Sequence, residues 1–214
     1  MKNILITLLA VVLFTPVFAQ IPKGTSTIGG NISLQRSTTQ YTYDGSSSLD
    51  GFKTEYKTNI LALTPSYGYF IVNNLSLGVN VNTFLSRATS KPYADVRDLH
   101  SDSRTIGVGP MVRYYLPLDS KLYLFGTASY SWLWSHSKYE NYDNTRITTS
   151  RSSVRYTMWD AGLGLSYFVS PTTAVEAGAT YSQLRYKNDD TYTADQEVNK
   201  LAFNLGFRVF LRKG

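Results

Sequence analysis

The chain has 214 residues, of which 43% are hydrophobic and only 17% are charged, and its formal net charge is +6. This length suits a single domain. The absence of Cys excludes a disulfide scaffold, thiol catalysis and a cysteine-based metal site. With His100 and His136 as the two histidines, a histidine-rich metal centre is not supported either, so we expect no metal and no cofactor.

The start of the chain has the features of a secretory signal peptide. Lys2 provides a basic start, an apolar run covers residues 4–14, and Ala19 is a small residue at a suitable cleavage point. A transmembrane anchor is less well supported, because the apolar run is short. We therefore expect a signal peptide over residues 1–19 and one mature domain over residues 20–214.

The mature part begins with segments in which large apolar residues alternate with small or polar ones. This is the pattern of a β-strand whose two faces meet different surroundings. Residues 25–37 form the first such strand, and a polar segment rich in Ser, Thr and Tyr follows over residues 38–54. Residues 59–85 then form the clearest hairpin, with a short turn at residues 72–74.

The sizes of the side chains in this hairpin indicate which of its faces points outward. A core built from Ala62, Gly68 and Gly78 would be poorly packed, and the opposite face would expose an apolar patch larger than soluble monomers carry. Lipid is therefore the expected surrounding of the bulky face, and the small and polar residues should face the lumen of a barrel. The alternative is a secreted lipocalin-like carrier, which would need an apolar interior.

Five further segments show the same alternation and complete a set of eight strands. They include residues 104–116, 121–134, 154–169, 175–182 and 200–211. Short turns lie near residues 117–120 and 170–173, and polar loops near residues 88–103, 136–153 and 188–196. We expect strands of about nine to fourteen residues in an eight-stranded antiparallel up-and-down transmembrane β-barrel of the outer membrane. The eighth strand should pair with the first, because an unpaired edge is costly in lipid.

Three stretches resemble a known family. The run TPSYGYF at residues 64–70, the run NLSLG at residues 74–78 and the run LGFRVF at residues 205–210 look like the small porin-like outer-membrane β-barrel proteins common in Bacteroidetes. More distantly, the chain is similar to the barrels of outer membrane proteins X and A. The resemblance implies a Gram-negative cell-surface protein that is exported through the periplasm, inserted by the barrel insertion machinery and surrounded by outer-membrane lipid.

The alternation also sorts the charged residues. An Arg or Lys that faces lipid at the bilayer midplane costs roughly 2–4 kcal/mol, so charges within the strands should face the lumen. A structural role for such charges is favoured over an ion path or gate, because eight strands leave a lumen that side chains can fill. Arg113, Glu176 and Arg208 each lie a few residues from a periplasmic strand end and should meet inside the barrel as hydrogen-bonded ions. The predicted lumen ion cluster consists of Arg113, Glu176, Arg208, Asp160 and Lys200.

Cations on the outward-facing positions occur near the loops. This rim consists of Arg36, Lys57, Arg87, Arg104, Arg155 and Arg185. Two interpretations are open: a ring that contacts the phosphates of lipopolysaccharide through charge-assisted hydrogen bonds, or ordinary snorkelling side chains. Just below the rim, at the level of the lipid headgroups, we predict an aromatic belt of Tyr130, Trp132, Trp134, Tyr156, Trp159 and Tyr181.

Catalysis is not expected. Both histidines have serine and acidic neighbours in the sequence, including Ser137 and Glu140 for His136 and Asp102 for His100. These groups lie in or beside polar loops, and neither has the His-x-Ser spacing of the lipid A deacylase family, so a lipid A-modifying enzyme is the least favoured function. Nucleic acid is not an expected partner, because the cations are spread around a rim instead of lining an aromatic groove.

These observations predict a non-enzymatic outer-membrane protein with a structural or surface-interaction role in adhesion or defence. The long extracellular loops are the expected contact region for an extracellular ligand. A narrow pore for small solutes is the alternative.

Overall fold

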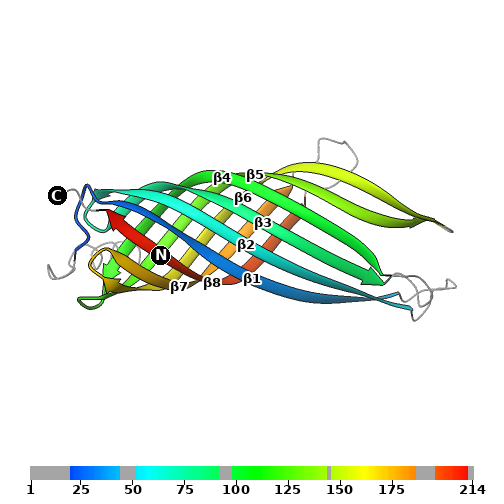
Figure 1. Ribbon diagram of the computed structural model, residues 1–214, viewed down its shortest axis with the longest axis horizontal. Helices are drawn as coiled ribbons and strands as arrows, with labels where there is room; N and C mark the ends of the chain where they lie inside the picture. The colour runs from blue at the N-terminus through cyan, green and yellow to red at the C-terminus, as the bar shows by residue number, and fades with distance from the viewer. Residues whose placement is uncertain (1–19, 44–51, 92–97, 144–145, 187–195, 212–214) are drawn as a thin grey trace, which may run out of the picture.

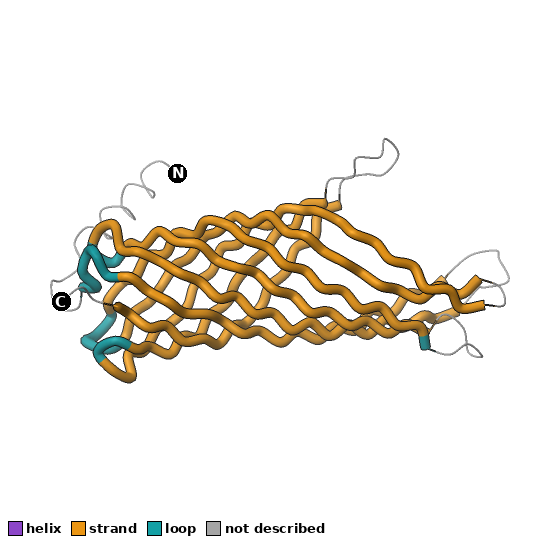
Figure 2. Tube along the Cα trace, turned by 45° about the horizontal axis from the view of Figure 1, so that its top comes forward, coloured by secondary structure: helices purple, strands orange, loops and turns teal. Residues whose placement is uncertain are grey.

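The computed structural model describes residues 20–43, 52–91, 98–143, 146–186 and 196–211. The predicted signal peptide, residues 1–19, lies outside the described residues. In the described part the chain consists of strands and the segments that connect them (Figure 2). No helix in these ranges is long and apolar enough to cross a membrane.

Eight antiparallel strands close into one barrel, as the sequence predicted. Each strand pairs with its neighbours in the sequence, and β1 also pairs with β8 (Figure 1). The strands are β1 (Ser26–Tyr43), β2 (Phe52–Val72), β3 (Leu75–Lys91), β4 (Leu99–Pro117), β5 (Leu122–Asp143), β6 (Arg146–Ser170), β7 (Thr173–Tyr186) and β8 (Gln196–Leu211).

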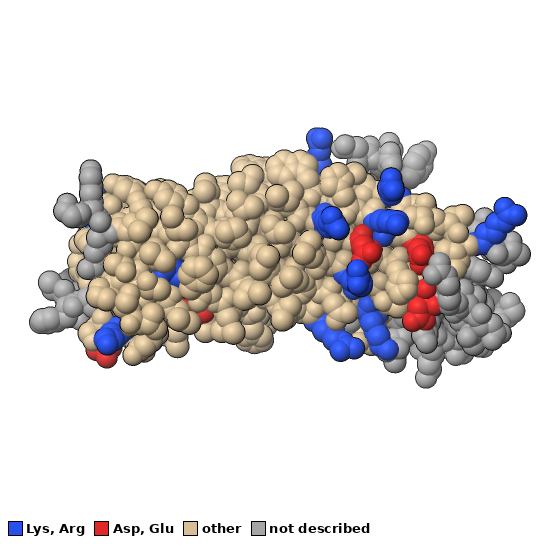
Figure 3. All heavy atoms as spheres, in the orientation of Figure 1, with Lys and Arg blue, Asp and Glu red and all other residues tan. Residues whose placement is uncertain are grey.

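In the middle of the barrel, most bulky apolar side chains point away from it and most small or polar ones point into it. Phe203 is 77% exposed and Leu163 is 66% exposed, whereas Asn82 and Ser131 are buried inside. Figure 3 shows the result on one face of the molecule: a broad middle band almost free of charged atoms, with Lys and Arg gathered towards the end that carries the long hairpins. Such a band is stable in hydrocarbon and not in water, which confirms the predicted orientation of the strands.

The strands are longer than predicted. β5 has 22 residues and β6 has 25, and much of the predicted loops at residues 38–54, 88–103 and 136–153 is paired strand. The prediction was wrong because it required one apolar face, which is needed only where a strand crosses lipid. Ser, Thr and Tyr continue the strands above the apolar band, since Thr and Tyr favour extended backbone and neighbouring strands supply hydrogen bonds.

At the opposite end, short turns join the strands and the start of the described chain folds against the barrel. The backbone N–H of Ile21 donates to the side-chain oxygen Oδ1 of Asn74 (2.8 Å), and the backbone N–H of Asn74 donates to the Ile21 carbonyl (2.9 Å). Asn74 has a φ of 63°, a conformation that Asn tolerates better than most residues. This clamp places the Ile21 side chain, which is buried, under the end of the lumen.

Side chains fill the lumen above this clamp. Phe168 and Phe210 lie with ring centroids 4.8 Å apart, and Tyr115 lies 5.9 Å from Phe210. Gly164 and Gly178 leave the space that the Phe125 ring occupies, because a Cβ at Gly164 would overlap it. We call this cluster the aromatic plug; it consists of Ile21, Phe70, Tyr115, Tyr123, Phe125, Phe168, Ala174 and Phe210.

Candidate functional site

The plug carries a buried ion cluster on its inner side. Glu176 Oε2 lies 3.0 Å from Arg113 Nη1, and Glu176 Oε1 lies 3.2 Å from Arg208 Nε. The Tyr115 hydroxyl donates to the same carboxylate, and the Arg113 guanidinium lies 3.8 Å from the centroid of the Phe125 ring. All three charged side chains are at most 2% exposed. We call Arg113, Glu176 and Arg208 the floor cluster.

The floor cluster holds two cations and one carboxylate. Arg208 also donates to Ser66 Oγ, whereas Arg113 Nε has no hydrogen-bond partner in the described part of the chain. Glu176 is therefore the group that both buried guanidiniums require, because an uncompensated buried charge is strongly unfavourable. This arrangement suits a rigid support for the lumen.

Asp160 and Lys200, which the sequence analysis placed in the same cluster, lie elsewhere. Asp160 Oδ2 accepts a hydrogen bond from Ser129 at 3.0 Å, and within the described ranges no ion pair joins either residue to the floor cluster. The reason is their height in the barrel. Glu176 and Arg208 lie close to the turn ends of β7 and β8, whereas Asp160 and Lys200 lie many residues from the turn ends of β6 and β8.

A continuous chain of hydrogen bonds runs along the lumen wall from β2 to β6. Thr64 donates to Asn82, Asn82 donates to Ser131 (2.9 Å), and Ser131 donates to Asn80. Asn80 in turn donates to Ser129 (3.1 Å), which donates to Asp160. The sequence analysis missed this network, although all of these residues occupy lumen-facing positions; only the heights of the strands reveal which of them meet.

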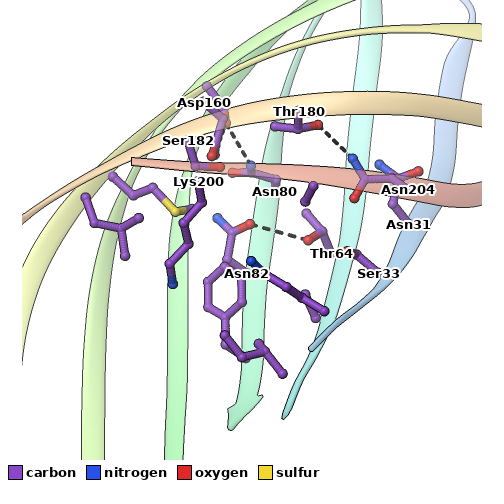
Figure 4. Close-up of a pocket in the computed structure, with 18 of the residues that line it drawn as sticks. Asn31, Ser33, Thr64, Asn80, Asn82, Asp160, Thr180, Ser182, Lys200 and Asn204 are labelled. Atoms are coloured by element: carbon purple, nitrogen blue, oxygen red, sulfur yellow. Dashed lines mark hydrogen bonds between the residues drawn. The ribbon is translucent and has the colours of Figure 1, made fainter. Parts of the chain in front are cut away.

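Except for Ser131, which is fully buried, these polar groups line a cavity of about 360 Å³ that begins at the floor cluster. Figure 4 shows side chains from β1, β2, β3, β6, β7 and β8 converging on it. It extends to a group of hydroxyls at Ser103, Thr105 and Ser135, and one side is apolar, where Tyr156, Met158 and Leu184 pack together. We call this cavity the lumen chamber.

Five residues of the predicted aromatic belt are exposed on the outside of the barrel, and Tyr156 is not. Trp132 and Trp134 are 49% and 40% exposed, and Tyr130, Trp159 and Tyr181 also face outward. Tyr156 is instead buried in the lumen, where its hydroxyl donates to Thr105 Oγ1. The prediction was wrong because Tyr156 lies three residues from Trp159, and residues an odd number apart on a strand face opposite sides.

The rim cations all lie on the outside of the barrel, just above the apolar band. Arg36 and Arg87 both lie opposite Asn59, from the two neighbouring strands, and Arg104 lies opposite Leu85. Arg155 pairs across the ladder with Trp134, so that cation and aromatic belt adjoin. The positive groups in Figure 3 follow this level, with acidic groups among them.

One acidic group near the rim is paired. Asp102 lies above the apolar band, and its Oδ1 accepts a hydrogen bond from Arg87 Nε at 2.9 Å. This hydrogen bond holds the pKa of the Asp102 carboxyl below its usual value. Both side chains are largely exposed.

A serine and a histidine meet at the same level. His136 Nδ1 lies 2.8 Å from Ser153 Oγ, across the β5–β6 ladder, a pair that the sequence analysis did not select. Within the described residues, no carboxylate accepts a hydrogen bond from the other ring nitrogen of His136. In the same part of the chain, no group of three or more His, Asp or Glu residues could hold a metal ion.

Comparisons with known proteins give a family match and several solved structures of similar fold. The model of the outer membrane protein beta-barrel domain family matches residues 5–209. No curated protein matches the sequence. The chain is similar to the outer membrane protein OprG from Pseudomonas aeruginosa, with 10% identity over 90% of this chain and 98% of that chain and a TM-score of 0.52. It is also similar to the outer membrane protease OmpT from Escherichia coli, with 12% identity over 90% and 98% of the two chains and a TM-score of 0.51. At these identities the likeness shows the fold alone.

Proposed function

This chain belongs to the outer membrane protein β-barrel domain family, and from that premise we propose that it is a non-enzymatic surface protein that presents a platform of β-hairpins above the outer membrane. Its location is the outer membrane. The platform contacts an extracellular ligand, and the rim below it contacts lipopolysaccharide. Adhesion or defence is the role that such a surface would serve.

The observation that carries this proposal is the continuation of paired strands above the apolar band. The β5–β6 ladder passes the level of Trp134 and Arg155 and continues without interruption to Asp143 opposite Arg146. Polar side chains such as Lys138 and Arg151 lie opposite each other on it. A surface that is already ordered loses less conformational entropy when it binds a partner, which favours specific recognition.

The rim supports a contact with lipopolysaccharide through the spacing of its cations. Side chains directly opposite each other on neighbouring strands have Cβ atoms roughly 5 Å apart. Arg36 and Arg87 are therefore roughly 10 Å apart across Asn59, which suits two phosphates of one anionic headgroup. Guanidinium groups bind phosphate with bidentate hydrogen bonds.

The lumen gives less support to a pore. The aromatic plug and the floor cluster pack the turn end of the barrel with side chains that are almost fully buried. A solute would have to displace both the rings and the paired charges. A closed lumen instead agrees with a barrel that anchors and supports the hairpins.

The non-enzymatic part of the proposal concerns His136 and Ser153. A serine nucleophile needs a base that is held in orientation by a third group, usually a carboxylate. The pair here lies on the outer surface, with both residues exposed. Replacing Ser153 with Ala should leave the acylation of lipid A unchanged in cells, and an altered acylation pattern would contradict this part of the proposal.

The rim is tested with purified lipopolysaccharide and the triple variant Arg87→Gln/Arg104→Gln/Arg155→Gln. If each exposed contact contributes about 0.5 kcal/mol, the variant should bind lipopolysaccharide about tenfold more weakly. Lys23→Gln/Lys121→Gln removes exposed cations at the opposite end of the barrel and should bind normally. Equal affinity of all three proteins would leave the rim as ordinary snorkelling side chains.

The platform is tested with a variant in which a short turn replaces residues 139–150, the end of the β5–β6 hairpin. The barrel should still form, as shown by heat-modifiable migration on a gel. Cells that produce the variant should lose the attachment or serum resistance that the wild-type protein confers. A folded variant with full attachment and resistance would contradict a role for this hairpin.

A further inference from the structure

The barrel wall is incomplete between its first and last strands. β1 pairs with β8 from Ser26 opposite Leu211 to Ile32 opposite Leu205, and no further pair joins the described residues of the two strands. β1 nevertheless continues to pair with β2, and β8 with β7. The two strands diverge towards the hairpin end (Figure 1). We call this opening the seam.

The seam begins within the apolar band. Leu34 and Phe203 would lie opposite each other if the register continued, and they are the most exposed large hydrophobic side chains of the described chain, at 78% and 77%. Arg36, the rim cation of β1, lies above them. The gap between the strands therefore faces the outer leaflet of the membrane and not only the water outside.

Unpaired backbone groups at this level are costly. An N–H or C=O without a partner in hydrocarbon costs several kcal/mol, so lipid-exposed sheet edges are avoided. Irregular backbone at membrane depth is tolerated where it lines a polar cavity. The seam meets that condition, because the lumen chamber lies directly behind it.

The lining of the chamber follows both edges of the seam. Ser33 and Gln35 on β1 and Ala202 and Asn204 on β8 all line the cavity. Lys200 lies two residues from Ala202 on the same face of β8. It lines the cavity as well and extends from its strand into the chamber (Figure 4). No hydrogen bond or ion pair joins the Lys200 amine to another described residue. The chamber thus offers an unpaired cation beside a lateral opening.

We propose that the lumen chamber binds a single-chain anionic amphiphile, with its carboxylate on Lys200 and its hydrocarbon tail leaving through the seam into the outer leaflet. The polar wall hydrogen-bonds the head, while Leu34 and Phe203 flank the tail. The cavity of about 360 Å³ lies within the size range of small-molecule sites. The plug below keeps the ligand from passing to the periplasmic end.

The floor cluster favours the same sign of charge. Arg113 and Arg208 together outweigh Glu176, and with Lys200 and Asp160 the charged groups that line the chamber sum to one positive charge, from three cations and two carboxylates. An anionic head therefore neutralises the chamber, whereas a cationic head would increase its charge.

The test uses the mature chain in phospholipid nanodiscs and a dodecanoic acid that carries a photoactivatable diazirine. After illumination, mass spectrometry of the peptides should locate the label on the chamber-facing residues of β1 and β8. Unlabelled dodecanoate should compete for this labelling, whereas butyrate, which lacks a tail, and dodecanol, which lacks a charge, should not. Competition by butyrate would show entry from the aqueous side and overturn the lateral route.

Two variants test the residues. Lys200→Met should reduce labelling of the chamber about tenfold, as expected for loss of one charge-assisted hydrogen bond. Lys121→Met removes an exposed cation at the turn end of the barrel and should label like the wild type. Ser33→Trp, which narrows the seam, should reduce labelling although Lys200 is intact. Labelling spread evenly over the apolar band, or equal labelling of wild type and Lys200→Met, would overturn the proposal.

Heat-modifiable migration confirms that each variant is folded before labelling. The extracellular hairpins take no part in this test. Failure here therefore leaves the proposed surface role untouched, and failure of the hairpin truncation leaves the chamber untouched.

Discussion

The two halves of the lumen are filled differently: one is tightly packed and the other contains a cavity. Near the turns, aromatic rings and a floor cluster at most 2% exposed fill the barrel. Towards the hairpins, hydroxyls and amides surround a cavity of about 360 Å³, and the wall itself opens between β1 and β8. Both halves are enclosed by the same lipid-facing strands, so the outside of the barrel does not determine what its inside does.

This difference separates stability from function. Tight packing and paired buried charges make the turn half costly to disturb. The hairpin half has spare volume and a wall of polar groups, which are the properties of a region that can bind a ligand. We expect substitutions in the first half to affect folding and substitutions in the second half to affect ligands.

The largest expected contrast is in chemical access. The chain has no Cys, so a single introduced cysteine can be labelled selectively. Ser182→Cys in the chamber should react with a membrane-impermeant maleimide added to intact cells, whereas Ser166→Cys, at a fully buried position of the turn half, should react only after unfolding. Similar labelling of both on intact cells would show that the plug is open.

The next contrast compares two carboxylates. Glu176→Gln should destabilise the barrel by about 3–5 kcal/mol, because Arg113 and Arg208 would lose their buried counter-charge. Asp160→Asn in the chamber should cost less than about 1 kcal/mol, because the amide can still bond Ser129. Urea unfolding in detergent micelles measures both. Equal losses would mean that the chamber is as tightly coupled as the floor.

The sequence alone predicts which side of each strand faces lipid, but not how high in the barrel each residue lies. The alternation of Leu163 with Gly162 and Gly164 predicted the lipid-facing side correctly, because the cost of misplacing side chains in lipid is large and local. The same alternation brought Arg113 into the lumen with Glu176. Asp160 was misplaced because alternation gives the side of a strand and not its height.

Other features require the register between distant strands. Phe70, Tyr115 and Phe210 each lie on a lumen-facing position near the last residue of a strand, at the turn end of the barrel, and this shared signal could have predicted the plug. The seam could not be predicted, because nothing in residues 33–36 or 201–204 differs from a paired strand in composition. The seam depends on how far the first and last strands, β1 and β8, pair with each other.

A smaller effect is expected at the turn clamp. Asn74→Ala should destabilise the barrel by about 1–3 kcal/mol, because the buried Ile21 amide loses its acceptor and Ala is less suited to a positive φ. The neighbouring Asn73→Ala is the control, since its bonds to Gln20 and Lys23 are exposed, and it should cost less than about 1 kcal/mol. Unfolding in urea distinguishes the two. Equal stability of the two variants would show that the clamp between Asn74 and Ile21 does not stabilise the plug.

The smallest effect is expected outside the membrane, at Arg87 and Asp102. The pKa of Asp102 is held below its usual value of 3.8 by the hydrogen bond from Arg87, so this pair contributes stability above about pH 4 and loses it as the pH falls through the lowered pKa. Arg87→Gln should return the Asp102 pKa towards 3.8, which a carbon-13 NMR titration of the carboxyl can follow. The change in stability should stay below about 1 kcal/mol, because both side chains are solvated. A larger loss would show that the rim, and not the lumen, holds the hairpin half of the barrel together.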